Sequence, residues 1–161
     1  MFAKSIRKMA GILAAATVVI GTTGNTMPVL AANTVLAGNT SDTTYTINVE
    51  SSSGSFKGVQ ERDKQNDSKV YVNISSSPTL YTQVRTYGNR NTTTYYNETK
   101  GTTATVKRGI PSSITNYCYE NRKPNYTYVL VKVKFRSNSS TTGAVTGVWS
   151  PDSTKNYTIV N

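Results

Sequence analysis

Hydrophobic and polar residues alternate along most of the chain from about residue 44 onward. The alternation is strictest in the segment 127–136, TYVLVKVKFR, whose apolar side carries Val129, Val131, Val133 and Phe135 and whose polar side carries Lys132, Lys134 and Arg136. A period of two in short segments rich in Val, Ile, Thr and Tyr is typical of half-buried antiparallel strands. The same pattern predicts strands over 45–49, 70–74, 80–87, 102–107, 144–149 and 157–160.

Turn-forming residues separate these segments. They gather at 51–54, 75–78, 88–91, 122–125, 138–143 and 150–153, and Gly, Pro, Asn and Ser clusters of this kind mark loops. About seven or eight short strands divided by regular turns predict an all-β fold, a single antiparallel β-sandwich. We expect no sustained helix after residue 32 and allow one helical turn at 112–117, which follows Pro111.

The first thirty residues follow another pattern. Lys4, Arg7 and Lys8 precede an apolar stretch at 9–20 that contains one threonine. A positive start followed by roughly 7–15 apolar residues is the organisation of a secretory signal peptide. A membrane anchor, the alternative, needs about 20 consecutive apolar residues, and this stretch is shorter.

Small residues mark the expected cleavage site. Val29 and Ala31 occupy the positions that a signal peptidase prefers, and cleavage after Ala31 or after Ala32 is equally compatible with the sequence. The sequence therefore predicts a signal peptide at 1–31, a flexible leader at 32–43 and a β-sandwich domain at 44–161. We expect a secreted protein without a transmembrane segment in its mature form, and any cell-wall association to be non-covalent.

The mature chain is basic. The sequence of 161 residues has 18 Lys and Arg against 8 Asp and Glu, and removing the three cations of the signal peptide leaves 15 against 8, a net charge of +7. Such an excess attracts anionic partners at long range, although a charge of this size also serves solubility alone. We expect an anionic cell-wall polymer or a surface protein as partner, and no nucleic acid.

The absence of histidine removes the commonest general base and metal ligand. A single cysteine cannot build a zinc site either, so we predict no metal, no cofactor and no catalytic residues. The acids Glu61, Asp63 and Asp67 alternate with Arg62 and Lys64. That mixture predicts a solvated loop or an edge strand whose charges discourage further sheet pairing.

Cys118 lies in the segment ITNYCY and has no partner within the chain. A free cysteine is usually a small buried hydrophobe, which is the structural role that we expect here. An intermolecular disulfide and a reactive thiol are also compatible with the sequence.

The polar side of the 127–136 segment is the main candidate for binding. Alternation places Lys132, Lys134 and Arg136 on one sheet face, about 7 Å apart. Arg122 and Lys123 lie in the preceding loop, and the candidate ring of Tyr128 is near them in sequence. Cations beside tyrosine rings can bind an anionic polymer by charge and stacking. An ordinary solvated face, kept from aggregating by its cations, is the competing interpretation.

The string GVWSPDS at 147–153 is distinctive. Trp149 is the single tryptophan and is expected to close one end of the core, with Pro151 setting the following turn. Together with ERDKQNDSKVYV at 61–72, this string resembles small secreted proteins of Gram-positive bacteria that form a family of unknown function. The resemblance covers about Tyr45 to Asn161 and implies origin and export, without an activity.

Four classes of function are compatible with these observations. The basic strand favours a secreted, non-enzymatic binding protein of the cell envelope. A bacteriocin-like or toxin-like effector agrees with size, charge and export, but the expected amphipathic helix of membrane-active peptides is missing. The third class is a hydrolase that uses two carboxylates, and the fourth is a self-assembling surface protein.

Overall fold

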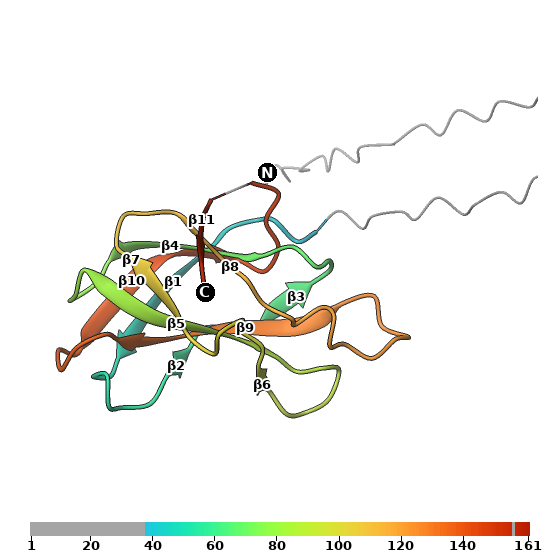
Figure 1. Ribbon diagram of the computed structural model, residues 1–161, viewed down its shortest axis with the longest axis horizontal. Coiled ribbons are helices and arrows are strands. Elements are labelled where there is room, and N and C mark those ends of the chain that lie inside the picture. The colour runs from blue at the N-terminus through green and yellow to red at the C-terminus, as the bar shows by residue number, and fades with distance from the viewer. Residues whose placement is uncertain (1–37, 156) are drawn as a thin grey trace, which may run out of the picture. The chain divides into compact units, whose positions relative to one another are not determined.

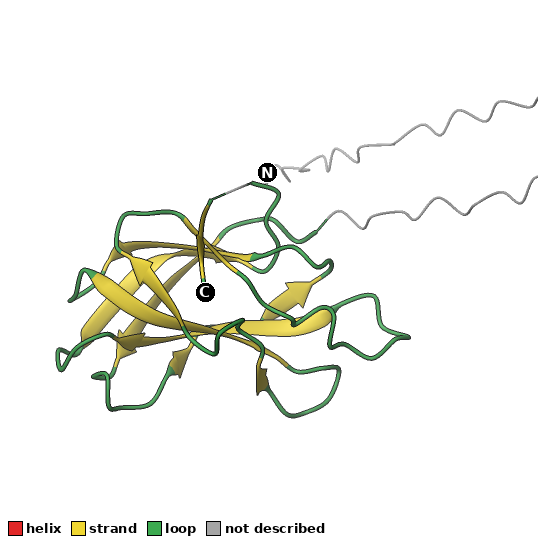
Figure 2. Ribbon diagram, in the orientation of Figure 1, coloured by secondary structure: helices red, strands yellow, loops and turns green. Residues whose placement is uncertain are grey.

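The computed structural model describes residues 38–155 and 157–161. The predicted signal peptide and the first part of the predicted leader lie outside the described residues. Within them the chain forms eleven strands joined by loops and turns, without a helix (Figure 2). Accordingly, the described residues include no helix long and apolar enough to cross a membrane.

One sheet has five strands. Its order is β1 (Thr43–Val49), β10 (Gly143–Ser150), β4 (Val70–Ser76), β8 (Ser112–Ile114) and β11 (Thr158–Val160). All neighbours in it are antiparallel except β8 and β11, which are parallel. The register of β10 against β4 shifts between Thr146 and Gly147, where a β-bulge interrupts the ladder.

The second sheet has six strands and faces the first as a separate layer (Figure 1). Its path is β2 (Lys57–Gly58), β9 (Val129–Ser137), β5 (Tyr81–Gly88) and β6 (Tyr96–Asn97). In addition, β3 (Arg62–Lys64) pairs with β9, and β7 (Ala104–Lys107) pairs with β5. The pairing of β5 with β9 extends over seven residues of each strand and forms the middle of this sheet.

The core lies between the two layers and follows from the alternation. Strand β9 buries every second residue, from Val129 to Phe135, and leaves the residues between them half-buried on the outer face. Across the core, the ring of Tyr45 on β1 stacks on Phe135 with 4.7 Å between ring centroids. Two sheets with one apolar face each bury those faces most simply against one another, and this gives the predicted sandwich.

The predicted all-β sandwich is confirmed, with two differences in detail. All seven alternating segments form strands, and β3 agrees with the edge strand that was one alternative for the charged segment 61–67. The strands β2, β6 and β8, each two or three residues long, were not predicted because so short a segment has no measurable period. The helical turn expected at 112–117 is wrong, since Ser112–Ile114 forms β8 and pairs with both β4 and β11. That second pairing is parallel, so the fold is not purely antiparallel.

Residues 38–43 are the described part of the predicted leader, and the last of them, Thr43, already belongs to β1. The backbone N–H of Asn39 donates to Asp152 Oδ2 at 2.7 Å, and its side-chain amide donates to the carbonyl of Asp63 at 3.0 Å. Arg62 in turn donates to the carbonyl of Ser41 at 2.7 Å. These contacts attach the segment to the sandwich before β1 begins at Thr43.

Candidate functional site

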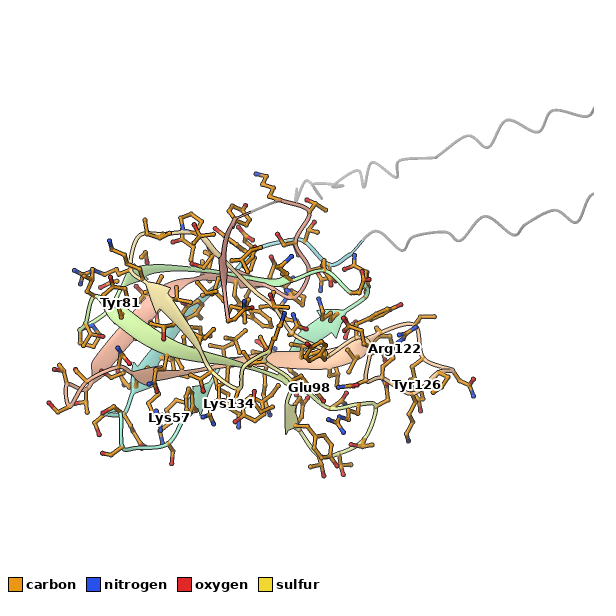
Figure 3. All side chains as sticks on the ribbon, in the orientation of Figure 1. Lys57, Tyr81, Glu98, Arg122, Tyr126 and Lys134 are labelled. Carbon is orange, nitrogen blue, oxygen red and sulfur yellow. The ribbon has the colours of Figure 1, made fainter. Side chains whose placement is uncertain are left out.

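Four cations lie on the outer face of the six-stranded sheet. We call Arg85, Lys132, Lys134 and Arg136 the basic face. The pairing of β5 with β9 sets Arg85 directly opposite Lys134, while Arg136 lies opposite Gln83. All four side chains alternate with buried residues on their own strands, so their cationic ends point away from the core. Figure 3 shows Lys134 and Lys57 on this outer side.

Aromatic rings lie under each of these cations. The guanidinium carbons of Arg85 and Arg136 are 4.1 and 4.3 Å from the centroid of the Phe56 ring. Lys134 Nζ is 4.1 Å from the Tyr87 ring, and Lys132 Nζ is 3.5 Å from the Tyr95 ring. Contacts of this kind stabilise an exposed cation by about 0.5–1 kcal/mol. The rings therefore hold the cations in place without neutralising them.

Carboxylates do not neutralise the basic face. The ion pairs among the described residues are Lys57–Glu50, Lys64–Asp152 and Arg90–Glu98, and none includes a member of the basic face. Glu61 accepts a hydrogen bond from Tyr95 Oη instead, and burial together with this carboxylate raises the pKa of Tyr95. Like charges directly opposite on neighbouring strands destabilise a sheet, so the placement of Arg85 opposite Lys134 is unfavourable in the absence of a counter-charge.

The polar contacts of the two arginines fix their geometry. Arg136 donates from Nε and Nη2 to Gln83 Oε1, at 3.0 and 2.7 Å, and from Nη1 to the carbonyl of Gly54 at 3.0 Å. Arg85 Nε donates to Thr103 Oγ1 at 2.8 Å. Because the acceptors are neutral, these contacts fix the orientation of both guanidinium groups without placing a negative charge beside them.

Arg85 and the rings were not among the residues predicted from sequence. The alternation of the 80–87 segment does place Arg85 and Tyr87 opposite the buried Val84, so that signal was present. Which strand would lie beside β9 was not readable, because sequence alternation does not determine strand order. Phe56 and Tyr95 lie outside the alternating segments and gave no signal.

The loop residues predicted to join this site have other contacts. Arg122 donates to the carbonyls of Tyr126 and Tyr119, at 2.8 and 2.9 Å, and its guanidinium lies 3.7 Å from the Tyr119 ring centroid. The backbone N–H of Lys123 donates to Asn91 Oδ1 at 3.1 Å, and Tyr128 keeps its ring exposed. The contacts of Arg122 therefore stay within its own loop, which precedes β9. Figure 3 shows Arg122 beside Tyr126.

Lys64, the last residue of β3, forms a buried ion pair with Asp152, away from the basic face. The Nζ of Lys64 donates to Asp152 Oδ1 at 2.9 Å, and both side chains are 0% exposed. The ammonium also donates to the carbonyl of Pro151 at 2.8 Å and to the carbonyl of Ser68. The alternating charges of the sequence predicted a solvated loop or an edge strand here. β3 is such an edge strand, but solvation is wrong for Lys64, because β3 turns this one side chain inward while it pairs with β9.

Asp152 is the acceptor at the centre of this cluster. Its Oδ2 accepts the backbone N–H groups of Asn39 and Gln65, at 2.7 and 2.9 Å, and its Oδ1 also accepts Ser68 Oγ at 3.3 Å. Three separate segments therefore meet at one carboxylate. The GVWSPDS string supplies this carboxylate, which explains why the turn at Pro151 is buried.

Trp149 and Cys118 both lie in the core. Trp149 is 1% exposed, and Arg62 lies over its ring with the guanidinium carbon 5.6 Å from the centroid. Cys118 is fully buried and packs against Gly88, and burial raises the pKa of its thiol from 9.0 to about 12. A thiol in this environment stays protonated near neutral pH and lies away from the surface.

Both buried carboxylates of the described residues, Glu98 and Asp152, accept hydrogen bonds from a cation and from further donors. Glu98 accepts from Arg90 Nε at 2.5 Å and from Asn121 Nδ2 at 2.6 Å, which ties the loop after β5 to the loop before β9. A shallow depression brings Asp42 to the same region as Asp152. Asp152, however, already accepts hydrogen bonds from an ammonium and three further donors.

Comparison with known proteins gives one result about descent. A family model described as "Protein of unknown function (DUF2712)" matches residues 33–153. The chain belongs to this family. The match covers the DUF2712 chain from residue 33, just before the described residues, to residue 153, just after β10, and so includes the basic face and both partners of the buried ion pair. Comparisons with curated proteins and with solved structures found no match.

Proposed function

We propose that this DUF2712 protein is exported by a Gram-positive bacterium and acts, without catalysis, by binding an anionic polymer of the cell envelope through its basic face. The single observation that carries the proposal is the pair Arg85 and Lys134, opposite one another without a carboxylate partner among the described residues. A bound anion would relieve that repulsion. A polymer with a regular row of phosphates or carboxylates could contact several of the four cations at once.

Two further observations support export. The family match begins at residue 33, just beyond the predicted cleavage site after Ala31 or Ala32. The segment 38–42 already contacts Arg62 and Asp152 of the sandwich. The region matched by the family and the folded domain therefore both begin shortly after the point where a signal peptide would be removed.

A binding function without catalysis agrees with the chemistry of the described residues. Their buried acids, Glu98 and Asp152, are held by cations and amides, and the sequence has no histidine. What the outer sheet face offers is a set of fixed, unpaired cations beside flat rings. Such a surface recognises charge and shape and supplies no nucleophile or general base.

The proposal is tested by sedimenting the mature protein with purified cell walls over a series of salt concentrations. A Lys132→Gln/Lys134→Gln variant removes two cations from the basic face, and a Lys100→Gln/Lys155→Gln variant makes the same charge change at exposed positions elsewhere. Exposed charge contacts contribute up to ~1 kcal/mol each, so the first variant should bind about tenfold more weakly. The second should bind like the wild type.

The source of the anion is separated by treating the walls before the assay. Binding that survives digestion of wall proteins, and is lost after chemical removal of phosphate-rich polymers, supports a polymer ligand. Binding that disappears with the wall proteins points to a surface protein instead. Salt-insensitive binding, or equal weakening by the two double variants, would overturn the electrostatic proposal.

A further inference from the structure

Strand β1 is an open edge of the five-stranded sheet. It pairs with β10 along Thr43–Val49. Apart from that ladder, none of the backbone hydrogen bonds found in residues 38–155 and 157–161 uses a group of Thr43–Val49. In an antiparallel ladder about half of the N–H and C=O groups of an edge strand point away from its one partner. Strand β1 is therefore an edge seven residues long, about half of whose backbone donors and acceptors have no backbone partner among the described residues.

The sequence of β1 has none of the features that usually keep an edge strand from pairing with another chain. Natural edge strands are usually shortened, charged, bulged or interrupted by proline, whereas TTYTINV has no charged residue and no proline, and its ladder with β10 is uninterrupted. The opposite edge, β11, has three residues, and the short strands β2 and β3 at the edge of the other sheet carry Lys57, Arg62 and Lys64. Among the described edges β1 thus stands out as long and neutral.

We propose that β1 pairs with β1 of a second copy of this chain, antiparallel and centred on Thr46, which joins the two five-stranded sheets into one. In this register Tyr45 faces Ile47 of the other copy on the core side, and Thr44 faces Asn48 on the outer side. Core-side residues meet core-side residues because the pairing is centred on a residue and keeps the alternation in step. All seven residues of each strand take part.

The neutral side chains of β1 allow a second copy to be the occupant. Each copy is strongly basic overall, so long-range repulsion opposes most self-contacts, but the two β1 strands bring only neutral side chains together. The acids at the ends of the strand, Asp42 and Glu50, would approach each other beyond the ladder. Glu50 is paired with Lys57 at 2.5 Å, and Arg62 lies within the electrostatic reach of Asp42. A second copy supplies a strand of the same length and neutrality, so all seven positions of the ladder are filled without a charged side chain inside it.

The two-fold symmetry of the proposed dimer also determines how the basic faces of the two copies are oriented. The two-fold axis of an antiparallel edge pairing is perpendicular to the joined sheet, so it leaves both six-stranded sheets on the same side. The basic faces of the two copies then point in the same direction. Two faces on one rigid body bind a repetitive surface more tightly than either face alone, because the second contact becomes intramolecular. The dimer itself does not depend on that binding.

Cysteine cross-linking tests the register. Residues opposite one another in an antiparallel pair have Cα atoms about 4.5–5.5 Å apart, which is within the range of a disulfide, so Thr46→Cys should form a covalent dimer under mild oxidation. Ala144→Cys is the matched control, exposed on the same face but one strand further in, on β10. Cys118 is buried and does not compete. Equal, slow cross-linking of both variants would overturn the proposal.

Sedimentation velocity of the untagged mature protein tests the assembly without cross-linking. The wild type should shift from monomer to dimer with concentration, and Thr46→Lys, which sets two ammonium groups opposite one another, should lose the dimer. Ala144→Lys should keep it. A wild type that remains monomeric at its highest soluble concentration, or a Thr46→Lys variant that still dimerises, would refute pairing at β1. Amide exchange of wild-type β1, slower at high concentration and faster on dilution, gives the same answer without a substitution.

Discussion

Replacing Lys64 with methionine tests how strongly the fold depends on its buried contact with Asp152. The substitution keeps a long apolar stem and removes the ammonium. Asp152 then remains as a buried carboxylate with donors from Asn39, Gln65 and Ser68 but without a counter-charge. The carbonyls of Ser68 and Pro151 also lose their donor.

The magnitude follows from the burial of both partners. Both side chains are 0% exposed, and removing one member of such a pair typically costs about 3–5 kcal/mol, because the other charge stays desolvated. That loss is comparable with the whole stability of a marginal domain, about 5–15 kcal/mol. Asp152→Asn, which keeps an acceptor for the two backbone N–H groups, should cost about 3 kcal/mol.

The double variant separates the pair from the individual groups. Lys64→Met/Asp152→Asn removes both charges, so the desolvated ion left by either single substitution is gone. The double variant should therefore be less destabilised than the sum of the two single variants by about 2 kcal/mol. An additive cycle would mean that the two groups act independently, contrary to their contact in the structure.

Urea unfolding followed by tryptophan fluorescence measures these differences. Trp149 is the single tryptophan, is 1% exposed, and lies three residues before Asp152, so its fluorescence reports directly on the region of the ion pair. Lys57→Met is the matched control, because its pair with Glu50 has side chains that are 45% and 41% exposed. It should leave the unfolding free energy close to that of the wild type, because solvent screens a pair so exposed. A Lys64→Met variant within ~1 kcal/mol of the wild type would refute the reasoning.

Three further predictions concern other buried contacts. Gly147→Ala should destabilise the domain by about 3 kcal/mol in urea unfolding, because its Cβ would lie 2.0 Å from the Asn73 carbonyl oxygen at the β-bulge. Glu98→Gln should cost about 1–3 kcal/mol and speed proteolysis in the two loops that it joins, since the charge facing Arg90 is lost. The Cys118 thiol should resist alkylation in the folded protein at pH 8, because burial raises its pKa to about 12.

The raised pKa of Cys118 also predicts how the unfolding free energy changes at alkaline pH. The unfolded chain releases the Cys118 proton near pH 9, whereas the folded chain keeps it to about pH 12. The contribution of the neutral thiol is therefore complete below pH 9 and is lost as the pH rises toward 12. Cys118→Ala should flatten the fall in unfolding free energy across that interval, and an unchanged slope would contradict the assignment.

Gly147→Ala and Glu98→Gln each have a matched control. Gly109→Ala meets no heavy atom within 4 Å, although its φ of +79° still disfavours alanine, so it should cost only about 1 kcal/mol. Glu120→Gln changes an exposed acid in the loop before β9 and should leave stability and proteolysis unchanged. Equal effects of Gly147→Ala and Gly109→Ala would show that the bulge can relax.

The alternating positions determined most of the framework. In β9 the period of two decides which residues are buried and which carry cations outward, and the structure has that arrangement from Val129 to Arg136. The reason is geometric, because successive side chains of any strand point to opposite faces. The core position of Trp149 also follows from its size and from the alternation of β10.

Tertiary structure alone decided which of these elements meet. Arg85 becomes part of the basic face because β5, rather than another strand, lies beside β9. Lys64 and Asp152 are 88 positions apart, and the charged segment around Lys64 resembles a solvated loop until β3 pairs with β9. Local pattern encodes the face on which a side chain lies, whereas partners across the fold are selected by the packing of the whole chain. That is why the cations on β9 were predictable, while the residue opposite them and the buried ion pair were not.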